Sequence, residues 1–214
     1  MSIDIAKAVL PLLLKGTVYT IELTLYSIIL GSILGVFITL MRISNNKILA
    51  SIASIYNWIF RGTPLLLQIS FFYFGLYFVG ITMTTMEAAI LSLSLNSAAY
   101  MSEIIRGGIL SVDKGQFEAS KALGFGYFTT MRKIILPQTI RVIIPSVSNQ
   151  FIGLLKDTSL VSVIALEELM KTASLQVSAR ADFTPYIMAA VIYLILTSMF
   201  NGIFSLAEKK LSVY

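Results

Sequence analysis

Apolar residues fall in long runs along this chain, and short polar segments separate the runs. A helix needs about 20 mainly apolar residues to cross a bilayer. The pattern therefore predicts an all-α integral membrane fold, with five transmembrane helices in one domain over residues 1–214. The predicted crossings are 17–41, 65–79 with its flanks, 85–105, 140–166 and 185–207.

Two shorter apolar segments do not reach spanning length. Residues 3–14 are interrupted by Pro11, and we expect them to form an amphipathic helix at the membrane interface. Residues 48–60 form a second short amphipathic segment, which ends at an Arg-Gly-Thr-Pro sequence. Gly31 and Gly35 have the G-x-x-x-G spacing that lets two helices pack closely, and we expect this contact within the subunit.

Composition and charge support a membrane location. Charged residues make up 13% of the chain, against about a quarter in soluble proteins. With the N-terminus outside, eleven of the 16 lysines and arginines fall on the inner side. The positive-inside rule therefore predicts an outside N-terminus and a cytoplasmic C-terminus. The net charge of +5 then reflects orientation, with no nucleic-acid partner. The chain has no histidine and no cysteine, so we expect no metal site.

The long polar segment at 107–138 carries a helical signal. Residues 116–123 favour a short helix with Ala119, Ala122 and Leu123 on one side. Gly124 and Gly126 would end this helix. The small side chains would let another protein approach the backbone closely. The alternative is an ordinary surface helix between two spans.

This segment resembles the EAA loop of permease subunits in binding-protein-dependent ABC importers. The family pattern is Glu-Ala-Ala, a glycine four residues later, and Ile-x-Leu-Pro downstream. The matching residues are Glu118, Ala119, Ser120, Gly124, Ile134, Leu136 and Pro137. Ser120 replaces the second alanine, which exchanges one small residue for another.

Three further segments resemble the polar-amino-acid branch of that family. They are 61–75, which begins Arg-Gly-Thr-Pro-Leu-Leu, 99–116, and Lys-Asp-Thr-Ser-Leu at 156–160. The resemblance implies a type I ABC importer permease in a bacterial cell membrane. Its implied partners are a second permease copy or paralogue, two ATP-binding subunits, an extracytoplasmic substrate-binding protein and an amino-acid substrate.

The resemblance also implies how force reaches this chain. In the family the EAA loop forms a cytoplasmic coupling helix that seats in a groove of the ATP-binding subunit. The residues carried over to that contact are Glu118, Ala119, Ser120, Ala122, Leu123 and Gly124. The chain contains no G-x-x-x-x-G-K-[ST] motif, so ATP and Mg²⁺ would bind the partner. We therefore expect neither catalytic residues nor a cofactor in this chain.

Polar residues inside the predicted spans mark a candidate substrate path. Asn96, Tyr100 and Glu103 share one helical face, and Gln150 and Asp157 belong to a second polar stripe. The two carboxylates suit an ammonium group, and a helix broken near Asp157 would offer backbone N–H groups and hydroxyls to a carboxylate. The predicted substrate-binding residues are Asp157, Glu103, Asn96, Tyr100, Gln150, Thr158 and Ser159.

Alternatives to this path remain open from the sequence. Glu103 can pair with Arg106, and Asp157 can pair with Lys156 or a neighbouring helix. Lys156 and Asp157 can also mark an interfacial turn before a surface hairpin instead of a broken helix in the path. If the two acids have no cation between them, they favour a basic amino acid; the alternative is that they serve the shared ammonium group. Functions of a different class are an ATP-independent channel or carrier and a docking subunit that transports nothing.

Overall fold

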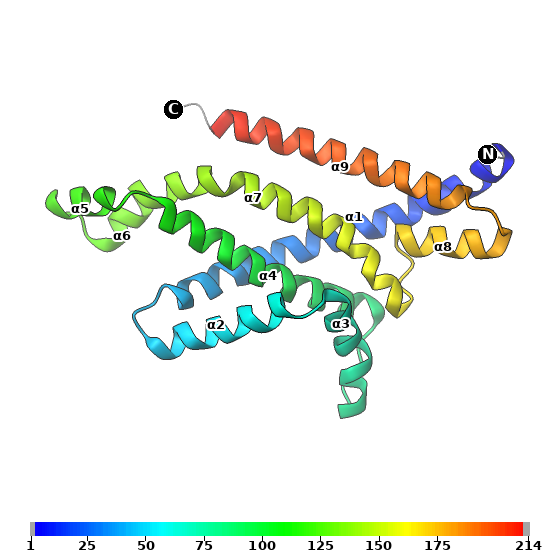
Figure 1. The fold of residues 1–214 in the computed structure, drawn as a ribbon, viewed down its shortest axis with the longest axis horizontal. Coiled ribbons are helices and arrows are strands. Elements are labelled where there is room, and N and C mark those ends of the chain that lie inside the picture. The colour runs from blue at the N-terminus through cyan, green and yellow to red at the C-terminus, as the bar shows by residue number, and fades with distance from the viewer. Residues whose placement is uncertain (1–2, 212–214) are drawn as a thin grey trace.

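The computed structural model describes residues 3–211, and the part it describes is helical with no strand. The long helices lie side by side along one direction (Figure 1). The all-α prediction is confirmed. The helices are α1 (Ile3–Arg42), α2 (Lys47–Gly62), α3 (Leu65–Ser70), α4 (Thr85–Ser111), α5 (Lys114–Ala122), α6 (Tyr127–Thr130), α7 (Leu136–Asp157), α8 (Leu169–Arg180) and α9 (Thr184–Leu211).

The first helix is continuous, which contradicts the separate interfacial helix expected over 3–14. Pro11 lies inside α1 without breaking it. A proline removes one backbone hydrogen bond, and tertiary packing offsets that loss here. Val9 and Leu13 are fully buried and pack with Leu169 and Ala173 of α8. The start of α1 is therefore held by helix packing within the subunit.

The described helices differ in whether they can cross a membrane by length and composition. Three helical spans are long and apolar enough to cross by themselves: Asp4–Arg42, Thr85–Ser111 and Thr184–Lys210. The pair Lys47–Gly62 and Leu65–Val79 qualifies jointly, but a bend of 103° separates its two parts. Length and composition thus support three or four crossings among the described residues. Five crossings remains a prediction that also needs α7.

The glycine pair of α1 packs against α4, as expected for a contact within the subunit. A Cβ atom on Gly31 would lie 2.8 Å from the Cβ of Ser97, and one on Gly35 would lie 2.8 Å from the Cβ of Met101. The two helices therefore approach as closely as the glycines allow. Leu93 of α4 is fully buried in the main core beside this contact.

The predicted break in the fourth apolar run is present. The α-helix α7 ends at Asp157 and the chain continues as a 3₁₀ segment, Thr158–Ile164. A left-handed residue, Ala165 (φ 61°), ends that segment and leads toward α8.

After α8, Thr184 starts α9, and its side chain and backbone hydrogen-bond the carboxylate of Asp182, which lowers the pKa of that group.

The two ends of the bundle carry different elements. The N-terminal end of α1 and helix α8 lie at one end, whereas α5, α6 and the C-terminal end of α9 lie toward the other (Figure 1). The described chain therefore begins and finishes at opposite ends. This arrangement agrees with an odd number of passes.

Candidate functional site

Helix α5 occupies the segment where the sequence predicts the coupling helix. The Oδ1 atom of Asp113 accepts a hydrogen bond from Gly115 N at 2.7 Å and so caps the helix start. Gly124 ends the turn with φ +77°, a left-handed conformation that favours glycine. Gly126 has an ordinary φ of −72°. Only Gly124 therefore supplies the backbone freedom expected of this glycine pair.

One face of α5 is left uncovered by the rest of the subunit. Glu118, Ala119 and Ala122 are exposed, and Leu123 is 73% exposed although it is a large apolar residue. Ser120 differs from the expectation, because it is 1% exposed and its hydroxyl donates to Gln116 O at 2.6 Å. Its small side chain fits the inner side of the helix. Ser120 therefore lies away from the exposed face that its neighbours form.

The carboxylate of Glu103 is already paired with cations. It lies 2.6 Å from Arg106 Nη2 and 3.7 Å from Arg42 Nε, and it accepts a hydrogen bond from Asn57 Nδ2 at 2.9 Å. Arg42 is also hydrogen-bonded to Ser54 of α2. This cluster joins α1, α2 and α4. The structure thus shows the pairing of Glu103 with Arg106 that the sequence left open as an alternative, and it adds Arg42 as a second cation that the sequence did not indicate.

The Asn96 side chain lies at the bend between α2 and α3. Its Nδ2 donates to Phe60 O and to Gln68 Oε1, both at 3.0 Å. The Nε2 of Gln68 donates to Phe60 O at 2.9 Å and to Thr63 Oγ1 at 2.9 Å. Asn96 is 6% exposed. Its amide is therefore occupied in holding the bend rather than open to a path.

Tyr100, the next residue of the α4 stripe, is more accessible. It is 38% exposed, and the Arg61 guanidinium lies 5.5 Å from the centre of its ring. This distance is within the range of a cation–π contact.

The predicted residues around the end of α7 have mixed surroundings. Asp157 is exposed, Gln150 is half-buried, and Thr158 is fully buried with its hydroxyl donating to Leu155 O at 2.8 Å. Ser159 lines a mainly apolar cavity of about 490 Å³ together with Tyr193 of α9. Asp157 is therefore exposed at the break in the helix, whereas the Thr158 hydroxyl is occupied by its hydrogen bond to the backbone carbonyl of Leu155.

The structure does not bring the two acids together. Glu103 lies about two turns before the end of α4, roughly 12 Å from that end at 1.5 Å per residue. Asp157 lies at the far end of α7, which runs back over roughly 33 Å. Helices α4 and α7 follow opposite directions in the bundle (Figure 1). Glu103 and Asp157 thus lie at different positions along the long axis of the bundle, and only Asp157 lies at the end that contains α8 (Figure 1).

A buried carboxylate that the sequence did not single out is Glu168. It is 0% exposed, and it accepts hydrogen bonds from the backbone N–H groups of Met170 (2.9 Å) and Lys171 (2.7 Å), which cap α8. Its Oε2 also accepts from Tyr193 Oη at 3.1 Å and Thr20 Oγ1 at 3.3 Å. Glu168 therefore ties α1, α8 and α9 together. The only sequence signal is an acid in front of a short helix.

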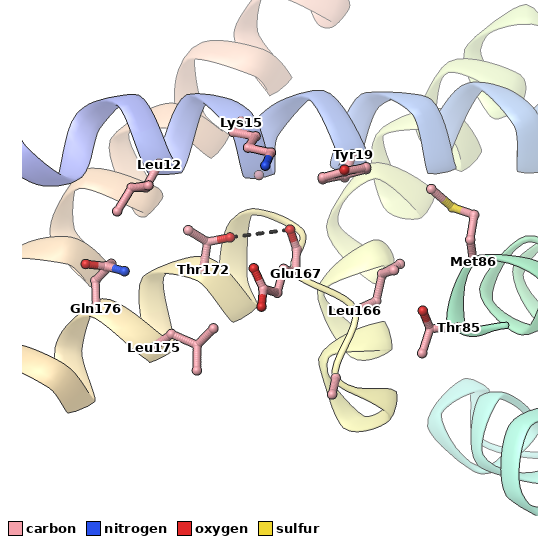
Figure 2. A pocket seen from close by; sticks show the side chains of 12 residues that line it. Leu12, Lys15, Tyr19, Thr85, Met86, Leu166, Glu167, Thr172, Leu175 and Gln176 are labelled. Carbon is pink, nitrogen blue, oxygen red and sulfur yellow. Dashed lines mark hydrogen bonds between the residues drawn. The ribbon is translucent and has the colours of Figure 1, made fainter.

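A pocket of about 500 Å³ lies next to this carboxylate, between α1, the start of α4 and α8 (Figure 2). Its polar lining includes Lys15 and Tyr19 from α1, Glu167 from the preceding loop, and Thr172 and Gln176 from α8. Sequence reasoning did not find this pocket, because its walls come from segments about 150 residues apart.

Known proteins resemble this chain over nearly its whole length. A family described as binding-protein-dependent transport system inner membrane component matches residues 27–213. A protein of Rickettsia bellii, named provisionally as a glutamine transport system permease, is 42% identical over 203 residues, covering 94% of this chain and 93% of the relative. The arginine transport system permease protein of Bacillus subtilis is 40% identical over 215 residues, covering 99% and 98%. The chain belongs to this family of inner membrane transport components.

Solved structures support the same assignment. A chain from the crystal structure of an amino acid ABC transporter with histidines matches with a TM-score of 0.92 and 39% identity, over 98% of this chain and all of the other. An inward-facing methionine ABC transporter matches with a TM-score of 0.81 at 22% identity, which shows likeness of fold alone. The fold is that of an ABC transporter permease.

Proposed function

We propose that this chain is the transmembrane subunit of an ATP-driven importer for polar amino acids. The observation that carries the proposal is the uncovered face of α5, which presents an EAA-like sequence and the exposed Leu123 beside it. Leu123 is followed closely by exposed Phe125, Tyr127 and Phe128, and such a group of exposed apolar residues on a polar loop marks a surface that a partner covers. The relatives named for glutamine and arginine transport, and the neighbour described with histidines, support an amino-acid substrate.

In this proposal, cytoplasmic ATP-binding subunits bind ATP and Mg²⁺ and move α5. The start of α1 lies outside the cell and the end of α9 inside, because most lysines and arginines then fall on the inner side. Two permease chains surround the path, and an extracytoplasmic binding protein delivers the substrate. The exposed α5 face faces the cytoplasm in this orientation, since it shares an end of the bundle with the end of α9 (Figure 1).

The substrate contacts are proposed at Asp157, Ser159, Gln150 and Tyr100, whose side chains are exposed or half-buried. Asn96, Thr158 and Glu103 support that path through their own hydrogen bonds and ion pairs. Because two arginines neutralise Glu103, its charge is not available to select a basic side chain. The proposal therefore covers polar amino acids in general, both glutamine and arginine included.

The test reconstitutes the chain with its ATP-binding subunit and binding protein in lipid, and measures ATP hydrolysis with and without single amino acids. The proposal predicts that glutamine or arginine raises the hydrolysis rate. A rate that no amino acid changes would favour a docking subunit. Substrate flux without ATP would identify a channel or carrier.

A further inference from the structure

The pocket between α1 and α8 has the features of a ligand site rather than of a packing gap. Lys15 and Glu167 both line it, and neither forms an ion pair with any residue the structure describes. In Figure 2 their side chains come from opposite walls, one from α1 and the other from the loop before α8. The pocket therefore carries one positive and one negative group without an internal partner for either.

The remaining walls combine hydrogen-bonding groups with apolar surface. Tyr19, Thr172 and Gln176 supply hydroxyl and amide groups, whereas Leu12 and Met86 supply apolar contacts. The volume of about 500 Å³ lies in the range of small-molecule sites. This lining matches a small ligand that carries one positive and one negative group close together, for Glu167 and Lys15, and a short carbon chain for the apolar surface.

The walls are fixed in place by tight packing. A Cβ atom on Gly16 would lie 2.8 Å from Thr172 Oγ1 and 3.1 Å from the Glu168 carbonyl, so α1 and α8 touch at the pocket floor. The buried Glu168 carboxylate holds the start of α8 through Met170 and Lys171. A site with fixed walls loses little entropy when a ligand enters.

We propose that this pocket binds the zwitterionic head of a free L-amino acid, with the α-carboxylate on Lys15 and the α-ammonium on Glu167. The inference rests on the proposed function, which places this end of the bundle outside the cell. The pocket is then an entry site, separate from the path residues Tyr100 and Gln150. A hydrogen bond from the Tyr19 hydroxyl suits a polar side chain.

The absence of cysteine allows a direct test by thiol labelling. Gln176→Cys places a thiol in the pocket, and Ser178→Cys places one on the exposed surface of α8 as a matched control. Both variants are prepared as the complex with the ATP-binding subunit, in nanodiscs of phosphatidylglycerol, and are labelled with a charged maleimide. L-Glutamine and L-arginine serve as ligands, and the amines that lack the α-carboxylate serve as ligand controls.

We expect a ligand at ten times its Kd to slow labelling of Gln176→Cys about elevenfold, because about one site in eleven stays empty. Labelling of Ser178→Cys should not change, and the decarboxylated amines should not protect. Adding Lys15→Gln or Glu167→Gln should abolish protection, and because both side chains are exposed, these variants should still elute as folded complex.

Absence of protection by either amino acid, or equal slowing at Ser178→Cys, would overturn the pocket proposal. Slowing by ethanolamine-headgroup lipid in place of amino acids would also overturn it, by assigning the zwitterion to a lipid. ATP hydrolysis, measured on the same complexes after the extracytoplasmic binding protein is added, separates the two proposals. Amino-acid-stimulated hydrolysis without protection rejects the pocket alone, whereas protection without any stimulated hydrolysis rejects the importer function.

Discussion

The bend between α2 and α3 depends on one amide of α4, and Asn96→Leu tests this dependence. Leucine has a similar size but no polar atoms, so the hydrogen bonds from Asn96 Nδ2 to Phe60 O and Gln68 Oε1 are lost. The Phe60 carbonyl oxygen still accepts a hydrogen bond in this variant, because Gln68 Nε2 donates to it at 2.9 Å. The Oε1 atom of Gln68 is left without its donor.

The cost follows from these two bonds. Hydrogen bonds between membrane helices contribute about 0.6 kcal/mol on average. A buried acceptor left without a donor costs about 1–3 kcal/mol. We therefore expect Asn96→Leu to lower the free energy of unfolding by about 1–3 kcal/mol. Because 1 kcal/mol corresponds to roughly 2–4 °C for a chain of 150–250 residues, the Tm should fall by about 2–12 °C.

Thermal unfolding of the purified complex measures this effect, and Trp58 offers a local probe. Trp58 is the only tryptophan and lies in α2 two residues before Phe60. Ser94→Ala is the matched control on the same helix, because the Ser94 hydroxyl is buried with no hydrogen-bond partner among the residues that the structure describes. That variant should unfold at or above the wild-type temperature. If Asn96→Leu keeps the wild-type Tm but loses amino-acid-stimulated ATP hydrolysis, Asn96 is a substrate ligand. That result would contradict its role in holding the bend between α2 and α3.

Three further substitutions test other contacts. Gly31→Ala places a methyl group 2.8 Å from Ser97 and should cost about 1–3 kcal/mol. In the control Gly202→Ala, the new Cβ meets none of the described residues within 4 Å, so the Tm should stay the same or rise slightly because alanine favours a helix over glycine. The Tm values of both variants check this. Ala122→Arg on the exposed α5 face should reduce stimulated ATP hydrolysis to the basal rate at an unchanged Tm, and full stimulation would exclude this face. Glu168→Ala leaves the α8 N–H groups uncapped and should cost about 2–4 kcal/mol, so an unchanged melting curve would contradict its role.

The sequence predicted the elements whose signals are local. The break near Asp157 and the short helix before Gly124 both follow from neighbouring residues, and the structure contains both. The interfacial helix was wrong, because the pattern around Pro11 could not reveal that Val9 and Leu13 pack against α8.

The candidate site was less predictable, because it depends on contacts between distant segments. Periodicity placed Asn96 and Glu103 on one face of α4 but did not reveal what covers each of them. Arg42 reaches Glu103 from the end of α1, and Gln68 reaches Asn96 across the α2–α3 bend. Glu168 had no local pattern, since its partners Thr20 and Tyr193 lie far away in the chain.

The central claim is that ATP hydrolysis by partner subunits drives amino-acid uptake through this chain. The most direct measurement follows radiolabelled glutamine and arginine into proteoliposomes that contain the chain, its ATP-binding subunit and its binding protein. The account predicts accumulation above the external concentration only when ATP is present at the α5 side, and loss of that accumulation in Ala122→Arg. Equilibration without ATP, or accumulation that Ala122→Arg leaves intact, would contradict it.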